Sequence, residues 1–370
     1  MVKANGSQEI RTLYPRLIHF GMDYGDLTQI SVDPHDWASW SRAVVDQGRK
    51  YEAGAEEAWI NGRKVSAIEW WGRASIHFHY AQLRLFDSKE KREHQADCRR
   101  NFSKIAPHID PEAVRLEVPY GSALLPGHLR VAHPGAPCVI LIGGLDSTKE
   151  VELHFFAEIF LKRGNSVFLF DGPGQGEMCE RLPMTADFNE AVSAVIDHLT
   201  ANPLVGTREF GVFGVSFGGY LACRAAAADS RVNACVSLGG FFDSRIFERL
   251  SPIAVATVRR AFGFDETGDL GPIAPQVTLE PLRGCMDRPL FVVHGRNDFL
   301  VDMAQVAALS DWACGPKRVW IMDEAEHVCT NRFSECLPEI GDWMSEQLAR
   351  SNGHYAATTA NESSYEQEVH

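Results

Sequence analysis

Six short apolar segments recur between residues 138 and 322, and stretches compatible with helices separate most of them. Strands that are apolar along their whole length are needed when helices cover both faces of a parallel sheet. Two further β-like runs, 114–118 and 129–131, are separated by the turn residues Gly121 and Pro126-Gly127 and predict an opening hairpin. The chain is therefore expected to fold around a mostly parallel, doubly wound α/β sheet. Its six other predicted strands are 138–142, 166–170, 210–213, 235–238, 290–293 and 319–322.

A chain of 370 residues exceeds the usual size of one compact domain, which favours a catalytic domain with a smaller appended unit. Residues 1–110 are expected to form a helical N-terminal or cap domain, because Asp33-Pro34 can start a helix and apolar residues follow at helical spacing. Residues 111–350 then form the sheet domain. Within it, 241–282 is interpreted as a helical lid insertion at the carboxyl ends of the strands, and 351–370 as a disordered tail.

The formal net charge of −13 and the pI near 5.5 argue against nucleic acid or a membrane surface as a partner. We therefore expect a small organic substrate and no cofactor, and a homodimer through the helical domain is a further hypothesis. The start of the chain carries Lys3, Glu9 and Arg11 in place of the apolar run of a signal peptide. No apolar stretch approaches the ~20 residues that span a bilayer, so a cytoplasmic protein is expected.

Nine cysteines lie scattered along the chain without any C-x-x-C pair, which indicates free thiols in a reducing compartment and argues against a zinc site. Cys329 lies two residues after His327 and could act as a reactive thiol, with a place in a loop or the core as the alternative. His77 and His79 are two residues apart on a predicted helix, so they point to different faces and cannot chelate one metal ion. No metal ion is therefore expected.

The segment from Gly214 to Gly218 reads Gly-Val-Ser-Phe-Gly and joins an apolar strand to a helix-compatible run. This pattern is that of a nucleophile elbow, in which a sharp strand-to-helix turn holds the serine hydroxyl clear of the backbone. The turn leaves almost no room for side chains two residues before and after the serine, which explains glycine at both positions. The motif alone is common by chance, but its setting makes Ser216 the candidate nucleophile.

A serine hydroxyl becomes an effective nucleophile only when a base takes its proton and a third group orients that base. After the serine, the sequence supplies Asp298 in the loop following strand 290–293, and then His327 in the loop after the last strand. With the serine, these two residues form the predicted catalytic triad. Asp302 is the alternative acid, although it can also cap the next helix, and His294 is expected to belong to the core.

The oxyanion that forms during attack on a carbonyl needs preorganised N–H donors, which two backbone amides usually supply in this architecture. Phe217, directly after the candidate nucleophile, is expected to provide one, and Gly144 or Leu145 in the loop after strand 138–142 the other. A plain turn is the alternative for that loop. The glycine-rich run 171–177 lacks the G-x-G-x-x-G spacing and a following lysine, so it does not predict a nucleotide site.

A closer resemblance rests on five features taken together. They are the helical N-terminal region, the run from Gly143 to Glu150, the run from Asp171 to Glu177, the elbow around Ser216 and the final His327. Over roughly residues 16–348 the chain resembles the 2,6-dihydroxypseudooxynicotine hydrolase family of α/β-hydrolases, and it is also similar to fungal polyketide-shortening hydrolases of the yellowish-green-1 type. The resemblance implies an α/β-hydrolase fold and cleavage of a carbon–carbon bond next to a ketone by the serine triad.

In the nicotine-degrading member of that family, the position matching Asp146 carries a glutamate thought to assist near the substrate. The shorter aspartate keeps the charge but reaches less far, so the resemblance implies an assisting role for Asp146 and leaves the exact substrate open. The N-terminal helices are expected to roof the pocket. Tyr24, Trp71 and Tyr80 are candidate walls of that pocket, with core packing as the alternative for each.

Two other classes of function stay open on the sequence alone. An ester, lactone or thioester hydrolase, or a cyclase that works through the same acyl-enzyme, needs the same triad. A non-catalytic ligand-binding protein on this scaffold would be expected to have a broken triad, whereas all three members are present here. The residues fit covalent attack by the serine and attack by a serine-activated water molecule equally well.

Overall fold

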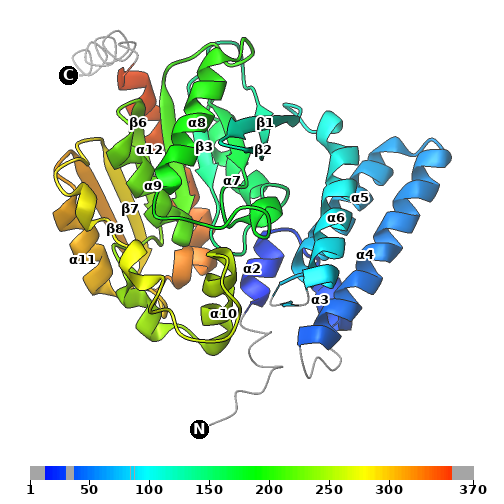
Figure 1. The fold of residues 1–370 in the computed structure, drawn as a ribbon. Helices are drawn as coiled ribbons and strands as arrows, with labels where there is room; N and C mark the ends of the chain where they lie inside the picture. The colour runs from blue at the N-terminus through cyan, green and yellow to red at the C-terminus, as the bar shows by residue number, and fades with distance from the viewer. Residues whose placement is uncertain (1–12, 31–36, 84, 87, 352–370) are drawn as a thin grey trace, which may run out of the picture.

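The computed structural model describes residues 13–30, 37–83, 85–86 and 88–351, and one eight-stranded sheet forms its centre (Figure 1). The strands are β1 (Val114–Tyr120), β2 (Ala123–Arg130), β3 (Cys138–Ile142), β4 (Ser166–Phe170), β5 (Phe210–Val215), β6 (Val232–Leu238), β7 (Leu290–Gly295) and β8 (Lys317–Met322). Their order in the sheet is β1-β2-β4-β3-β5-β6-β7-β8. Strand β2 is antiparallel to both of its neighbours, and the pairs from β4 to β8 are parallel. The predicted α/β fold, with an opening hairpin and a mostly parallel sheet, is confirmed. Pro126-Gly127, predicted as part of the turn, instead lies inside β2 and pairs with β1.

The alternation of side chains along each strand divides the core between the two faces of the sheet. In β3, Ile140 and Ile142 belong to one apolar cluster, whereas Val139 and Leu141 belong to the other. All residues of this strand are buried, because helices cover both faces. The first cluster includes residues of α8 (Phe188–Ala201), α9 (Phe217–Ala228) and α11 (Met303–Trp312). The second includes residues of α7 (Glu152–Leu161), α12 (Phe333–Ser351) and the N-terminal helices.

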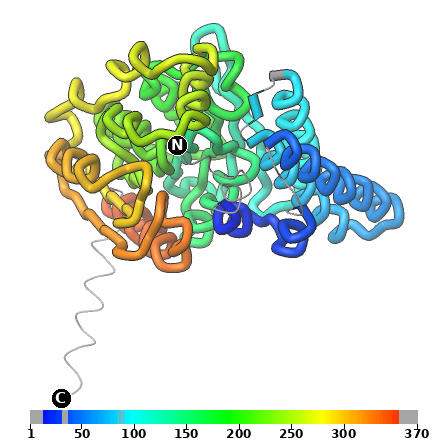
Figure 2. The backbone as a smooth tube through the Cα atoms, turned by 90° about the horizontal axis from the view of Figure 1, so that it is seen from below, coloured from blue at the N-terminus to red at the C-terminus, as the bar shows by residue number. Residues whose placement is uncertain are grey.

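The N-terminal part of the described chain is helical, and its long helices project to one side of the sheet domain (Figures 1 and 2). The helices are α2 (Tyr14–His19), α3 (Tyr24–Ile30), α4 (Trp37–Ile60), α5 (Lys64–Ala81) and α6 (Ser88–Ile105). Helix α5 contacts both α4 and α6. The sequence predicted the first helix near Asp33, but α2 and α3 precede this residue. The charged segment 88–93 forms the start of α6. In α6 only one side is buried, through His94, Cys98 and Phe102.

The last helical element before the sheet, η1 (Ala106–His108), ends just before residue 110, and β1 begins just after it. The boundary predicted at residue 110 lies between these two elements. Between β6 and β7 the chain forms η3 (Ser244–Arg249), α10 (Pro252–Ala261), η4 (Ala274–Gln276) and η5 (Glu280–Leu282). The predicted tail lies outside the described residues from 352 onward. Within the described ranges, none of the helices combines the length and the apolar character needed to cross a bilayer.

Candidate active site

Ser216 lies at the sharp turn between β5 and α9. Its backbone has a φ of 57°, a left-handed conformation that residues with a side chain rarely adopt. A Cβ at Gly214 would lie 2.0 Å from the carbonyl oxygen of Gly218, and a Cβ at Gly218 would lie 2.2 Å from that of Ile142. Both glycines are therefore required by the close packing of the elbow, which places the serine at the carboxyl edge of the sheet.

The three predicted triad residues lie in one continuous chain of contacts. Ser216 Oγ is 2.9 Å from His327 Nε2, and His327 Nδ1 is 2.7 Å from Asp298 Oδ2. The other carboxylate oxygen of Asp298 accepts hydrogen bonds from the backbone N–H groups of Leu300 and Val301 at 2.8 and 2.9 Å. The carboxylate is therefore held in an orientation that lets it accept a hydrogen bond from the Nδ1–H group of the imidazole.

The charge of Asp298 suits this arrangement. Burial raises the pKa of its carboxyl group, but the neighbouring His327 and the hydrogen bonds to it outweigh burial, and the pKa lies below the usual value. An ionised Asp298 keeps the proton on Nδ1 of the imidazole and leaves Nε2 to accept the serine proton. Val328 and Cys329, directly after the histidine, have φ values of 52° and 55°. This tight turn after β8 brings the imidazole to the serine.

The other candidates for these roles have different environments. Asp302 Oδ1 accepts a hydrogen bond from the N–H group of Ala304, so this carboxylate caps the N-terminus of α11. His294 is buried, and its Nε2 lies 3.0 Å from the carbonyl oxygen of Val301. Cys329 is buried too. A hydrogen bond to a second buried cysteine, together with burial, raises the pKa of its thiol, which therefore stays protonated.

The residues predicted to donate to an oxyanion flank Ser216. Phe217 is the first residue of α9, and the opening N–H groups of a helix have no partner within it. Gly144 packs against the elbow, because a Cβ there would lie 3.3 Å from the carbonyl oxygen of Val215 and 3.5 Å from Ser216 Cβ. Leu145 follows Gly144 in the loop after β3. The fold thus brings the backbone of both predicted donor segments to the serine.

The glycine-rich run 171–177 supports this loop. Gln175 Nε2 donates to the carbonyl oxygens of Gly143 and Gly144 at 2.5 and 3.4 Å. Because Gln175 is buried, these hydrogen bonds fix the loop where backbone N–H groups must be held rigidly. The sequence did not predict this role, since the partners of Gln175 are backbone atoms more than 30 residues away in the chain.

A buried group of charges ties the same two loops together. Lys149 is fully buried, and its Nζ lies 2.6 Å from Glu150 Oε1, 2.8 Å from Asp171 Oδ2 and 3.1 Å from Glu177 Oε2. Burial lowers the pKa of the ammonium group, but the three carboxylates raise it more, so Lys149 remains charged. Three carboxylates this close together could hold a metal ion. The ammonium group already supplies the positive charge between them, so we interpret the group as a structural ion network.

A small cavity of about 30 Å³ lies between the loop after β3, the N-terminal helices and α10. Asp146, which the resemblance assigned an assisting role, lines the cavity together with Leu145. Further lining residues include Gln82, Phe86, Lys91, Cys179, Thr257 and Arg260.

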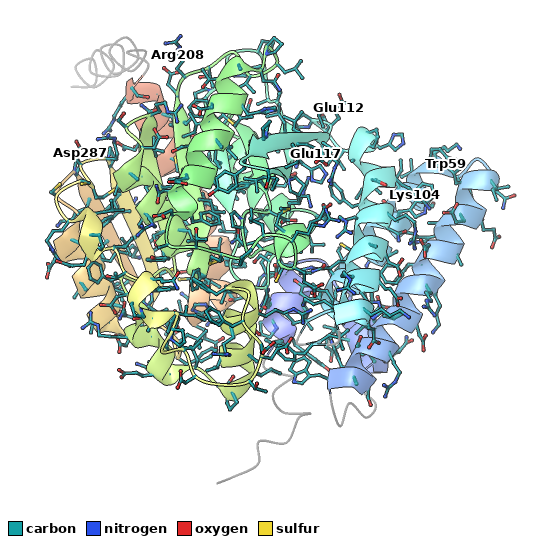
Figure 3. All side chains as sticks on the ribbon, in the orientation of Figure 1. Trp59, Lys104, Glu112, Glu117, Arg208 and Asp287 are labelled. Carbon is teal, nitrogen blue, oxygen red and sulfur yellow. The ribbon has the colours of Figure 1, made fainter. Side chains whose placement is uncertain are left out.

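The three aromatic residues proposed as pocket walls do not line this cavity. Tyr24 has 66% of its surface exposed. Trp71 is buried beside Trp59 and Lys104, which Figure 3 labels toward the far end of the helical region. Tyr80 is fully buried, and its hydroxyl donates to a carboxylate of α7 at 3.4 Å. Aromatic character alone did not reveal which helix face meets the sheet domain.

That carboxylate belongs to Glu152, which joins the N-terminal helices to the sheet domain. Its Oε1 accepts a hydrogen bond from Arg16 Nε at 2.8 Å, and its Oε2 lies 3.6 Å from His79 Nε2. Burial raises the pKa of Glu152, but Arg16 and His79 outweigh burial and lower the pKa to about 2. His79 Nδ1 also lies 3.3 Å from Thr148 Oγ1, so the network reaches the end of the loop after β3.

Replacing Glu152 with glutamine is expected to lower the free energy of unfolding at pH 7 by about 3–5 kcal/mol, because Arg16 loses its buried partner. The folded pKa, about 2, lies below the ordinary 4.5, so this stabilisation is complete above pH 4.5 and is lost as the pH falls toward 2. Urea unfolding should therefore show a smaller difference between wild type and Glu152→Gln at pH 3 than at pH 7. Glu93→Gln is the control, since Glu93 and its partner Lys89 are both exposed. Equal losses for both variants would contradict the role of Glu152.

Comparisons with known proteins agree with this architecture. The family model described as FrsA-like, esterase FrsA-like, matches residues 46–252, more than half of the chain. The chain is 30% identical over 339 residues to 2,6-dihydropseudooxynicotine hydrolase of Paenarthrobacter nicotinovorans, covering 90% of this chain and 91% of that protein. The crystal structure of 2,6-dihydroxy-pseudo-oxynicotine hydrolase superimposes with a TM-score of 0.82 at 28% identity, over 91% of this chain and 96% of that one. The resemblance inferred from the sequence is confirmed.

Fungal hydrolases match a shorter part of the chain. The 20-hydroxy-prefusarin hydrolase of Gibberella moniliformis is 35% identical over 225 residues, which cover 56% of this chain and 53% of the fungal protein. The chain thus spans about half the length of this relative. The protein AbyA5 shares the fold, with a TM-score of 0.67 at 18% identity over 91% of this chain and 97% of that one.

Proposed function

The chain belongs to the FrsA-like esterase family of α/β-hydrolases, and from this membership we propose that it cleaves a carbon–carbon bond next to a ketone. The proposed substrates are aryl ketones or polyketide β-dicarbonyls. The observation that carries the proposal is the chain of contacts from Ser216 through His327 to Asp298. The substrate class draws on the similarity to 2,6-dihydropseudooxynicotine hydrolase, which extends over about nine tenths of both proteins.

In the proposed reaction, His327 Nε2 accepts the proton of Ser216 Oγ while this oxygen attacks the ketone carbon. The carbonyl oxygen becomes an oxyanion, which the backbone N–H groups of Phe217 and of Gly144 or Leu145 stabilise. When the carbonyl re-forms, the bond to the neighbouring carbon breaks. The electron pair of that bond leaves with the departing fragment as a carbanion, which is an enolate when a second carbonyl group lies next to it.

Protonation of the departing carbon completes the first half of the reaction. The imidazolium of His327 holds the proton taken from the serine, and Asp146 in the adjacent cavity is the second candidate donor. Water then attacks the acyl group on Ser216 and releases it as a carboxylic acid. If Ser216 and His327 instead activate a water molecule for direct attack on the ketone, the same two products form.

Ester hydrolysis is the second candidate function, because the matching family model is described as that of an esterase. An ester, lactone or thioester presents a similar carbonyl carbon, and the triad and oxyanion donors act on it in the same way. The difference lies in the leaving group, which is an alkoxide or thiolate in place of an enolate. A cyclase would transfer the acyl group to a hydroxyl of the substrate itself.

Product analysis by mass spectrometry separates these functions. Wild type and Ser216→Ala are incubated with an aryl β-diketone, a naphthopyrone-type polyketide and a p-nitrophenyl ester. We expect wild type, but not the variant, to release an acyl fragment as an acid from the diketone or the polyketide. Serine-dependent turnover of the ester alone would favour the esterase function.

We further propose that this reaction takes place in the cytoplasm on a small-molecule substrate. All nine cysteines are free thiols in the structure, which supports a reducing compartment. A homodimer through the N-terminal helices stays a prediction, and sedimentation of the purified protein measures its mass directly.

A further inference from the structure

Lys91, in the first turn of α6, carries a charge that the triad and the oxyanion donors do not use. Its side chain lines the cavity that Leu145 and Asp146 also line. The ammonium group donates to the carbonyl oxygen of Gln82 at 3.1 Å, and among the described residues no carboxylate lies within ion-pair distance of it. An ammonium group has three N–H donors. Two of them are thus left for a ligand or for water.

Other cations in this part of the molecule have protein partners. Arg260, which lines the same cavity, pairs with Glu180 and donates to two backbone carbonyl oxygens of the N-terminal region. Lys149, which follows the cavity residue Thr148 in the chain, is surrounded by three carboxylates. Lys91 differs from both because the contacts of its ammonium group are with a neutral oxygen.

The electrostatic surroundings of Lys91 favour an anionic ligand. Burial lowers the pKa of its ammonium group, and the more distant charges of Asp146, Cys179 and Glu180 oppose this effect while Arg260 adds to it. A desolvated ammonium group gains most from a negatively charged oxygen placed directly beside it. Among the described residues, no side chain places a negatively charged oxygen in contact with the Lys91 ammonium group. A bound molecule with such an oxygen would complete this contact.

We propose that Lys91 stabilises the enolate oxygen of the departing fragment, and that the substrate therefore carries a second carbonyl group β to the one attacked. This inference rests on the proposed carbon–carbon cleavage at Ser216. The loop after β3 packs against Ser216 through Gly144 and lines the cavity through Leu145 and Asp146. The oxyanion loop and Lys91 thus line the same small cavity, and a β-dicarbonyl has one oxygen for the loop and one for Lys91.

The electrons move as follows in this step. Ser216 Oγ is bonded to the attacked carbon, and the oxygen on that carbon carries the negative charge. As the carbonyl re-forms, the bond from the attacked carbon to the α-carbon breaks, and its electron pair forms a double bond from the α-carbon to the second carbonyl carbon. The negative charge then lies on the second carbonyl oxygen, beside the ammonium group of Lys91. The imidazolium of His327 protonates the α-carbon and converts the enolate into a ketone.

The test compares Lys91→Met with wild type on an aryl β-diketone and on an ester of the same acyl group. Removing one group that stabilises a developing oxyanion reduces kcat by roughly 10²–10³-fold. We expect the ratio of kcat on the diketone to kcat on the ester to fall by about 100-fold, because the ester releases no enolate. Lys91→Arg keeps the charge and should restore part of this ratio. Lys89→Met is the matched control, since Lys89 is exposed on the same helix and pairs with Glu93.

A second measurement uses diketones whose departing ketone carries increasingly electron-withdrawing groups. Their enolates need less stabilisation, so Lys91→Met should approach the wild-type rate as the departing ketone becomes more acidic, a trend that a merely structural role would not give. Equal losses on diketone and ester, or the same dependence on acidity in both proteins, would overturn the role of Lys91. A wild type that hydrolyses the ester but no diketone would overturn the carbon–carbon cleavage itself, and this inference with it.

Discussion

Ser216→Ala is expected to reduce kcat on every substrate by about 10⁶-fold, the order seen when a triad serine is removed from a serine hydrolase. The substitution removes the oxygen that lies 2.9 Å from His327 Nε2 and that attacks the carbonyl carbon. It changes no other contact of the elbow, so the fold should be retained. Turnover is measured by mass spectrometry of the products, and circular dichroism compares the melting temperatures.

Ser103→Ala provides the matched control for this variant. Ser103 is exposed on α6, and its hydroxyl donates to the carbonyl oxygen of Arg100 in the same helix. This change should leave turnover within about a factor of two, as is usual for surface substitutions away from a site. If Ser216→Ala stayed folded and kept a substantial share of wild-type activity, another residue would have to be the nucleophile.

Asp298→Asn is expected to reduce kcat by about 10⁴-fold while leaving the fold intact. Asp298 Oδ2 is 2.7 Å from His327 Nδ1, where an ionised carboxylate accepts a hydrogen bond from the Nδ1–H group. An amide can turn its N–H groups toward Nδ1, which moves the imidazole proton to Nε2. The imidazole then has no free lone pair facing Ser216 and cannot accept the serine proton.

Asp302→Asn is the control for the acid. Asp302 is four residues further along the same loop and caps α11 with its carboxylate. Asparagine is also a good N-cap residue, so both the stability and the turnover of this variant should stay near those of wild type. Should Asp302→Asn prove the damaging change and Asp298→Asn a mild one, the assignment of the acid would be wrong.

The sheet could be predicted from the sequence because each strand is buried on both faces. Val139 and Ile140 face opposite sides and both pack in an apolar cluster, so the whole run must be apolar. The sequence predicted helices through this region but not the start of α6 at Ser88, because most of the side chains that open this helix are charged and face solvent. The signal for that helix lies in His94, Cys98 and Phe102, whose spacing of four residues marks the buried side.

The contacts among the three residues of the predicted triad could be anticipated from the sequence because Asp298 and His327 each follow a strand, and the carboxyl ends of parallel strands meet at one edge of the sheet. The cavity could not be located in this way. Gln82, Asp146 and Cys179 come from separate segments, and they meet only because the N-terminal helices pack beside the loop after β3. Tertiary packing of this kind leaves no local pattern, so a partly buried cation such as Lys91 could not be distinguished from other lysines.

Covalent labelling tests the nucleophile most directly. Wild type is incubated with a fluorophosphonate, and the labelled peptides are identified by mass spectrometry. The adduct is expected on Ser216, to be absent from Ser216→Ala, and to form far more slowly in Asp298→Asn. An adduct on a different residue, or labelling that continues at the wild-type rate in Ser216→Ala, would contradict the assignment of the triad.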